Sequence, residues 1–349
     1  MKLLLNCSIL AAILFLPQGG QAAELPGLKV LETRKIWPGE PHSAFTDLER
    51  FQGKWYCAFR VGKGHAGKGD HGRIRVIVSD DGKSWRVAAL LQTKGVDLRD
   101  AKLSVTPSGK LLLNSCEYRV DNDNADVRNN TSVTYLSGNG TDWSTATEIA
   151  DKGYWLWQTT WRGNNGYALG YQWGNLDATR FYRTTDGVNY ILHVDHLRPP
   201  GDRSNEHAMF FDSNGRAHML LRRDNAQSKT GGFALLGEAE APYTDWEWRR
   251  LNITLGGPSM IQLPDGRVIA CVRRYAGENH RNWGSQWTEL GWIDTEAAKY
   301  TPAAKLPSGG DSSYAGLVWH KEMLWVSYYS SHEGNTSIYL AKVRVEKLD

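Results

Sequence analysis

Three short stretches decide the fold of this chain: 79-SDDGKSW-85, 137-SGNGTDW-143 and 184-TTDGVNY-190. Each has Ser or Thr, any residue, Asp or Asn, Gly, two further residues, and Trp or Tyr. An Asp-Gly or Asn-Gly pair after a strand-like run is typical of a hairpin turn, in which the Asp or Asn side chain bonds its own backbone. We expect the aromatic residue to fold back under the turn and cover the hairpin. The repetition indicates architecture rather than a binding site.

A second repeat is interleaved with these turns. Six β-hairpins are predicted at 45–60, 103–116, 157–173, 208–222, 260–273 and 317–329. Five of them have a turn glycine, namely Gly53, Gly109, Gly166, Gly215 and Gly266, and residues 320–323 form the sixth turn. Successive glycines are 56, 57, 49 and 51 residues apart. A period of about 50 residues, all strand and turn, is typical of a propeller with one four-stranded blade per unit. The sequence therefore predicts an all-β, six-bladed β-propeller, with residues 28–37 completing the last blade.

The N-terminus predicts export. Residues 1–23 have one Lys, a short apolar run and small residues around Ala22 and Ala23, which is the pattern of a cleaved signal peptide. The apolar run is shorter than the roughly 20 residues that span a bilayer, and no later segment is apolar enough. We therefore expect residues 24–349 to form one propeller domain that is secreted or periplasmic, with no membrane span.

Composition narrows the class of partner. The formal net charge of +3 comes without a Lys/Arg tract, so no nucleic-acid partner is expected. Cys57, Cys116 and Cys271 lie in strand-like runs, and an odd number in an exported chain favours buried free thiols over disulfides. The 15 Trp and 15 Tyr suit a glycan ligand, because aromatic faces stack on the C–H faces of sugars.

The repeat register predicts which side chains meet at the central channel. Seven residues after the turn glycines lie Arg60, Cys116, Trp173, Arg222 and Arg273. Nine residues before the turn lie Asp100 and Glu206, and Tyr314 precedes the sixth hairpin at a comparable place. Arginine forks bind carboxylates bidentately, so this set favours a site for an anionic sugar.

The repeated turns on six blades of an exported chain resemble the sialidase (neuraminidase) superfamily over nearly the whole mature chain. The resemblance implies a glycoside hydrolase without cofactor or metal, in which Tyr314 is the nucleophile and Glu206 is its base. It implies that Arg222 binds the substrate carboxylate and that Glu333 steadies an arginine. Arg273, Arg274 and Arg281 compete for a further arginine position. The general acid falls in the loop 61–72, where Asp70 is the match and His65 the rival.

One motif departs from the family pattern. Sialidases begin the first blade with Phe-Arg-Ile-Pro, whose arginine joins the carboxylate clamp, whereas this chain has His42 and Ser43 there. Arg60 lies one strand later. A related acidic or neutral sugar is therefore an alternative to sialic acid, with His42, His65 and Asp47 as specific contacts.

Each candidate also has a structural interpretation. Tyr314 could be a packed blade aromatic, Glu206 a solvated loop charge, and Asp100 a partner of Arg99. The three register arginines could pair with rim carboxylates, and for Asp70 in its Gly-rich loop the structural interpretation is favoured. The acidic run 121–130 lacks EF-hand spacing and is predicted to be a loop, and His193 with His196 is predicted to be an edge-strand pair rather than a metal site.

The leading hypothesis is an exported exo-acting glycoside hydrolase that releases a terminal acidic sugar from a glycan. The alternatives are a lectin-like propeller that binds glycans without turnover, and a uronate-polymer lyase that uses His42 or His65.

Overall fold

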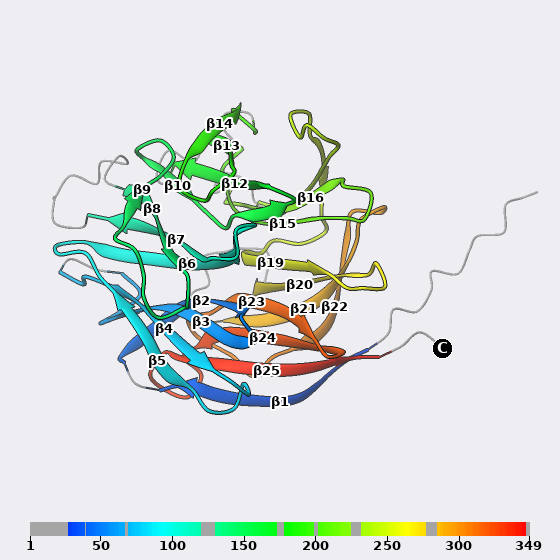
Figure 1. Cartoon of the computed structure of the whole chain (residues 1–349). Coiled ribbons are helices and arrows are strands. Elements are labelled where there is room, and N and C mark those ends of the chain that lie inside the picture. The colour runs from blue at the N-terminus through cyan, green and yellow to red at the C-terminus, as the bar shows by residue number, and fades with distance from the viewer. Residues whose placement is uncertain are drawn as a thin grey trace, which may run out of the picture.

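The computed structural model describes residues 27–38, 40–66, 69–119, 130–172, 178–198, 202–224, 232–276 and 285–346. The predicted signal peptide lies outside these residues. Within the described residues, every regular element is a β-strand. The strands form six antiparallel sheets that follow one another around the molecule (Figure 1). In the described part of the chain, no helix is long and apolar enough to cross a membrane.

The first three blades follow the chain order from the inner to the outer strand. They consist of β2 (His42–Phe51), β3 (Lys54–Gly62), β4 (Arg73–Ser79) and β5 (Arg86–Leu91); β6 (Asp97–Val105), β7 (Leu111–Tyr118), β8 (Asn130–Ser137) and β9 (Thr147–Glu148); and β10 (Tyr154–Leu156), β11 (Thr160–Arg162), β12 (Asn165–Gln172), β13 (Thr179–Thr184) and β14 (Tyr190–Asp195). The inner strand of blade three is interrupted, so β10 and β11 both pair with β12.

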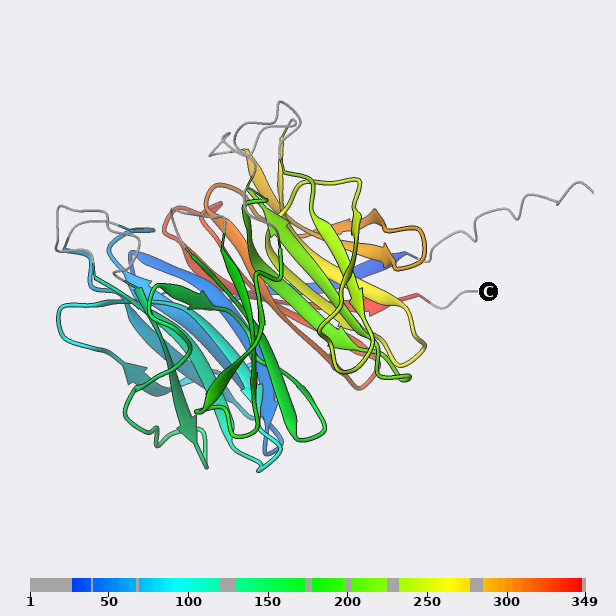
Figure 2. The ribbon, with the colours of Figure 1, turned by 90° about the horizontal axis from the view of Figure 1, so that it is seen from above.

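The last three blades have the same organisation. They consist of β15 (Ser204–Phe211), β16 (Ala217–Arg223), β17 (Leu235–Ala239) and β18 (Glu247–Arg250); β19 (Gly256–Gln262), β20 (Val268–Tyr275), β21 (Gln286–Asp294) and β22 (Lys299–Lys305); and β23 (Ser312–His320), β24 (Met323–Ser330), β25 (Ser337–Val345) and β1 (Leu28–Trp37). The pairing of β1 with β25 closes the ring and confirms the prediction that residues 28–37 complete the last blade. Figure 2 shows the blue β1 beside the red β25 from above.

The three repeated turns share one geometry. In the first, Asp81 Oδ1 accepts the backbone N–H groups of Lys83 and Ser84 at 2.7 and 3.0 Å, and Ser79 Oγ accepts that of Gly82 at 2.8 Å. These backbone bonds hold the pKa of Asp81 at about 2. Asn139 and Asp186 bond their own turns in the same way, and the aromatic residues Trp85, Trp143 and Tyr190 pack on the blade cores.

The six predicted hairpins are the inner pairs of the blades, with one correction. Gly53, Gly109, Gly215 and Gly266 have φ between 75° and 90°, as turn glycines require. Gly166 does not lie in a turn, because it pairs with Trp161 inside the hairpin of blade three. The turn there contains Gly163, which has the positive φ of 54°. Two glycines three residues apart made the position ambiguous from the sequence.

The core consists of apolar layers between neighbouring blades. Ala58 and Val76 of blade one, for example, pack with Leu103 and Leu111 of blade two, and each of the other five junctions has its own cluster. Burying one such aliphatic side chain contributes roughly 1.5–3 kcal/mol, so the junctions fix the angle between the blades. Cys57, Cys116 and Cys271 are buried free thiols in these layers, as predicted.

The inner strands carry an irregularity that creates the site. In five blades the pairing of the innermost strand with the second slips by a β-bulge, and in blade three the strand breaks after Leu156. A bulge adds an unpaired residue and re-aims its side chain. The residues at these six places are Phe45, Asp100, Trp157, Glu206, Gly257 and Tyr314. Each blade therefore contributes one such residue at its bulge or break.

Candidate active site

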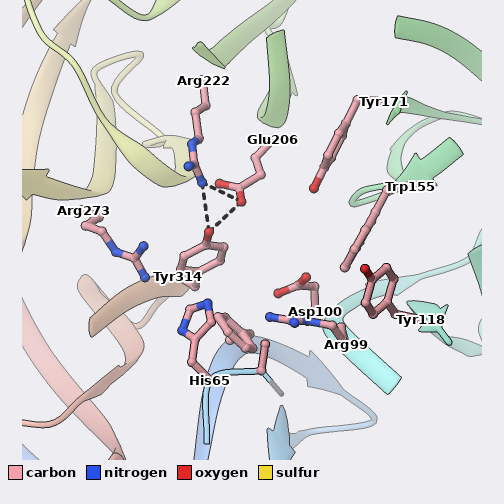
Figure 3. A pocket seen from close by; sticks show the side chains of 12 residues that line it. His65, Arg99, Asp100, Tyr118, Trp155, Tyr171, Glu206, Arg222, Arg273 and Tyr314 are labelled. Atoms are coloured by element: carbon pink, nitrogen blue, oxygen red, sulfur yellow. Dashed lines mark hydrogen bonds and ion pairs between the residues drawn. The ribbon is translucent and has the colours of Figure 1, made fainter. Parts of the chain in front are cut away.

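A cavity of about 240 Å³ lies over these bulges. Its aromatic lining is Phe45, Tyr118, Trp155, Tyr171 and Tyr314. Its ionisable lining is His65, Arg99, Asp100, Glu206, Arg222 and Arg273 (Figure 3). The residues come from all six blades, so the closed ring is needed to assemble the site. Of the residues predicted for this site, Tyr314, Glu206, Asp100, Arg222, Arg273 and His65 lie together here.

Tyr314, Glu206 and Arg222 form a closed triangle of polar contacts (Figure 3). The Tyr314 hydroxyl donates to Glu206 Oε1 at 2.6 Å, and one Arg222 amino group lies 3.1 Å from that hydroxyl and 2.8 Å from the same Oε1. Asp224 accepts the opposite edge of the guanidinium at 3.1 and 2.8 Å, which fixes its plane. Burial, together with the charge of Glu206, raises the pKa of Tyr314 well above its usual range, so the phenol is protonated at rest.

Gly257 provides the space for this arrangement. Its backbone N–H donates to Glu206 Oε2 at 2.9 Å, so both carboxylate oxygens of Glu206 have a donor. A Cβ atom at Gly257 would lie 2.7 Å from the Tyr314 ring, which is closer than real Cβ contacts allow. The φ of 52° also favours glycine. Blade five, which has a glycine at its bulge, therefore leaves room for the Tyr314 ring of blade six.

Arg273 is held beside the Tyr314 ring by protein acceptors. Its Nε donates to the Ser312 carbonyl at 2.8 Å, one amino group donates to the Tyr329 hydroxyl at 2.6 Å, and its carbon Cζ lies 4.8 Å from the ring centre of Tyr314. Asp311 Oδ1 accepts from Tyr329 at 2.8 Å and lies 3.4 Å from the same guanidinium.

His42 and His65 meet at the other oxygen of Asp311. His42 Nε2 and His65 Nδ1 lie 2.9 and 2.7 Å from Asp311 Oδ2. Burial acts to raise the pKa of Asp311, but the two histidine hydrogen bonds and the charge of Arg273 hold it well below its usual range. His65 lines the pocket, whereas His42 lies behind it as a support for Asp311.

The same three residues are the one group among the described residues that has metal-ligand geometry, with donor atoms within 4.8 Å of one another. The hydrogen bonds account for the cluster without a metal ion, because one carboxylate oxygen accepts from both rings and the other faces Arg273 and Tyr329. A cation there would also face the positive guanidinium.

Arg99 is a pocket residue that the sequence reasoning named only as a partner of Asp100. It follows from the bulge on β6, which turns two consecutive side chains into the cavity (Figure 3). The guanidinium makes no side-chain hydrogen bond with any described residue, and its nearest carboxylate oxygen, Asp97 Oδ2, is 3.7 Å away. Its N–H groups are therefore not committed to protein acceptors in the described chain, unlike those of Arg222.

An aromatic wall stands opposite Arg273. Trp155 and Tyr171 are parallel to within 5° at 6.2 Å between ring centres, and Tyr118 continues the row at 6.4 Å from Trp155 (Figure 3). The spacing of these residues carried no sequence signal beyond the aromatic abundance, because they lie on the inner and second strands of two different blades. Flat rings of this kind offer a stacking surface for a sugar.

Asp70 and Arg60, predicted as general acid and substrate contact, do not line the pocket. Arg60 is fully buried and bonds Asp97 at 2.7 Å, with Asp70 at 3.3 Å. The Asp70 carboxylate accepts the backbone N–H groups of Lys63 and Gly64, each at 2.9 Å, and so closes the loop that carries His65. Burial acts to raise the pKa of Asp70, but the two backbone hydrogen bonds and the charge of Arg60 lower it below its usual value. The structural interpretation of Asp70 accounts for its contacts.

Other candidates also lie outside the pocket. Glu333 pairs with Lys35 at 2.7 Å and accepts the Tyr339 hydroxyl at 3.1 Å, and no arginine among the described residues pairs with it. Arg274 pairs with Glu289 at 3.1 Å, and Arg281 and Trp173 lie outside the described residues. Asp47 is buried and accepts the backbone N–H groups of Leu48 and Leu103, and Cys116 is buried in the core.

Comparison with known proteins gives similarity in structure only. No family model and no curated protein matches the chain. A Dyadobacter fermentans protein of unknown function has a TM-score of 0.75 at 14% identity, with 92% of this chain and all of that chain covered. An α-L-arabinanase of Penicillium chrysogenum, solved with arabinobiose, has a TM-score of 0.66 at 13% identity over 89% of this chain and 98% of that one.

A Trypanosoma rangeli sialidase has a TM-score of 0.65 at 12% identity, and the match covers 86% of this chain but 54% of that sialidase. At these identities the likeness establishes the fold. The chain is a six-bladed β-propeller, and its fold is similar to that of this arabinanase and this sialidase.

Proposed function

We propose that this protein is an exported, exo-acting glycoside hydrolase that releases a terminal acidic sugar from a glycan. The observation that carries the proposal is the 2.6 Å hydrogen bond from the Tyr314 hydroxyl to Glu206 at the floor of the pocket. A tyrosine nucleophile is a known exception among glycosidases that otherwise use two carboxylates. The predicted signal peptide supports export.

The pair explains how a phenol can attack. Tyr314 has a raised pKa, so it needs a base that removes its proton as the bond to the anomeric carbon forms. Glu206 is within hydrogen-bond reach and is oriented by Gly257 and Arg222. Arg222 also contacts the phenol oxygen, where its charge stabilises the developing phenolate.

The substrate anion is assigned to Arg99. Arg222 and Arg273 already bond protein acceptors, whereas the Arg99 guanidinium makes no side-chain hydrogen bond to any described residue. A buried, unsatisfied guanidinium nitrogen costs free energy that a carboxylate ligand would recover. In this arrangement Arg222 and Arg273, which the family resemblance offers as carboxylate ligands, would position Tyr314, and Arg99 of blade two would bind the substrate anion.

The size of the pocket supports exo action. Its volume of about 240 Å³ is below the ~300 Å³ lower end of typical ligand pockets, which suits one sugar residue rather than a chain. The wall of Tyr118, Trp155 and Tyr171 would stack on that residue.

The proposal is tested with 4-methylumbelliferyl glycosides of sialic acid, glucuronic acid, galacturonic acid and, as neutral comparison, L-arabinofuranose. We expect turnover of at least one acidic glycoside. Arg99→Gln should lower its kcat/KM by roughly 10- to 100-fold, the worth of a hydrogen bond to a charged group. Arg274→Gln, which changes an arginine outside the pocket, is the matched control. Binding of the acidic sugars without any turnover would instead identify a lectin-like propeller and refute the proposal.

A further inference from the structure

Hydrolysis of an unactivated glycosidic bond needs a proton donor for the leaving oxygen. The aspartate that the family resemblance offers is Asp70, but its carboxylate is held by Arg60 and two backbone N–H groups away from the pocket. All of these contacts favour the ionised form. The donor therefore has to be found among the groups that line the cavity.

Asp100 is the lining carboxyl group that is left for this role. It occupies the bulge of blade two, across the cavity from Tyr314 and Glu206 (Figure 3). The residue is 8% exposed and borders the pocket, and its carboxyl makes no hydrogen bond or ion pair with any described residue. Glu206, the other lining carboxylate, is bonded to Tyr314, Arg222 and Gly257.

The surroundings of Asp100 favour its protonated form more than water does. Burial raises the pKa of Asp100 to about 6, and the nearby Arg99 opposes this effect. The other ionisable groups that face it are Asp97 and Lys102 on β6, Cys116 on β7, Tyr171 on β12, Glu206 on β15 and Tyr314 on β23. A substrate anion paired with Arg99 would offset the charge that opposes protonation, so substrate binding should favour the acid form further.

We propose that Asp100 is the general acid and base of the reaction. This inference rests on the proposed function. As Tyr314 oxygen forms its bond to the anomeric carbon and gives its proton to Glu206, the glycosidic C–O bond breaks and its electron pair stays on the leaving oxygen, which takes the Asp100 proton. In the second step, water attacks the anomeric carbon and gives one proton to the Asp100 carboxylate. The tyrosine C–O bond breaks in the same step, and the phenolate recovers its proton from Glu206.

The test compares two glycosides of the same acidic sugar. One is an aryl glycoside, whose phenolate leaves without a proton, and the other is an alkyl glycoside, whose alkoxide needs one. Asp100→Asn suits the test because Asn tolerates the φ of 52° at this position. We expect kcat/KM to fall roughly 10²- to 10⁴-fold on the alkyl glycoside, the usual contribution of general acid catalysis, and much less on the aryl glycoside.

Two further measurements separate a proton donor from a structural residue. In the wild type, kcat/KM on the alkyl glycoside should fall as the pH rises through about 6, because the acid must be protonated, and this limb should be absent in Asp100→Asn. With the aryl glycoside, added azide should accelerate Asp100→Asn and yield the glycosyl azide, since azide attacks the glycosyl-tyrosine without needing a base.

The outcomes are distinct. If the wild-type protein hydrolyses neither glycoside of any panel sugar, both this inference and the proposed function fail. If it hydrolyses them but Asp100→Asn affects the two glycosides equally, or the basic limb disappears in His65→Gln or Asp70→Asn instead, this inference alone is overturned.

Discussion

The replacement Tyr314→Phe removes one oxygen and separates catalysis from stability. Glu206 keeps its contact with Arg222 at 2.8 Å and the Gly257 N–H at 2.9 Å, so no buried carboxylate loses all its partners. The stability cost is therefore about 2 kcal/mol, the net worth of the two hydrogen bonds that the hydroxyl makes with Glu206 and Arg222, which lowers the Tm of a chain of this size by roughly 4 °C. The nucleophile, in contrast, is lost completely. We expect turnover to fall about 10³-fold or more, since loss of a nucleophile elsewhere costs up to ~10⁶-fold.

Tyr329→Phe is the matched control for this experiment. Its hydroxyl also lies between a carboxylate and an arginine, at 2.8 Å from Asp311 and 2.6 Å from Arg273, but it does not line the pocket. It should show a similar fall in Tm, because the hydroxyl likewise makes two hydrogen bonds, but at most about a tenfold loss of turnover, because neither bond involves Tyr314 or Glu206. A slowly hydrolysed fluorinated glycosyl fluoride should add one sugar to the wild type at Tyr314, detected by peptide mass spectrometry. Turnover by Tyr314→Phe above a tenth of wild type, or an adduct on another residue, would refute the assignment.

Three further predictions concern the supports of the site. Gly257→Ala should lower turnover at least tenfold and should have a lower Tm than the control Gly266→Ala. Both alanines would have positive φ at a cost of about 1–2 kcal/mol, but only the alanine at 257 would contact the Tyr314 ring. Equal effects of the two variants on turnover and Tm would contradict this reasoning. Asp70→Asn should lower the free energy of unfolding by roughly 1–3 kcal/mol above about pH 4. Because the native pKa of Asp70 is depressed, the difference between variant and wild type should shrink as the pH falls through that pKa. A difference that stays constant with pH would show that the charge of Asp70 does not contribute. Prolonged dialysis against a chelator should change neither Tm nor turnover, because hydrogen bonds from both histidines already satisfy Asp311. A fall in Tm that Zn²⁺ reverses would instead identify His42, His65 and Asp311 as a metal site.

The fold was predictable from local signals that repeat. The turn pattern depends on a few hydrogen bonds within each hairpin, such as those of Asp81, and these form wherever the motif occurs. A single repeat would not have sufficed, but the period near 50 residues fixed both the number of blades and the closure of the ring by residues 28–37. Gly166 was misplaced because a strand glycine and a turn glycine stand three residues apart in blade three.

The pocket was only partly predictable, since the register gives a position along the strand but not the direction of the side chain. Glu206 and Tyr314 lie at their bulges and enter the cavity, whereas Arg60, seven residues after its glycine, turns into the blade to meet Asp97. Arg222 and Arg273 share the register of Arg60 and do reach the cavity. The difference comes from the acidic partners Asp70 and Asp97, which lie on a loop and on the neighbouring blade and carry no signal in the sequence near Arg60.

The bulges explain how side chains from all six blades can meet in one pocket. An unbroken inner strand would direct alternate side chains into the blades on either side, so consecutive residues could not both reach the channel. The bulge on β6 lets Arg99 and Asp100 do so, with a φ of 52° at Asp100, and the bulge on β2 has a φ of 59° at Phe45. Bulky residues with positive φ cost roughly 1–3 kcal/mol each and persist where the surrounding structure holds them. Here Phe45 and Tyr314 are buried against each other at 5.3 Å between ring centres, so the packing that offsets the cost also fixes the tyrosine opposite Glu206. Asp100 and Glu206 line the pocket at their bulges without belonging to the apolar core, so their exchange would alter the chemistry of the pocket while leaving the apolar layers between the blades unchanged.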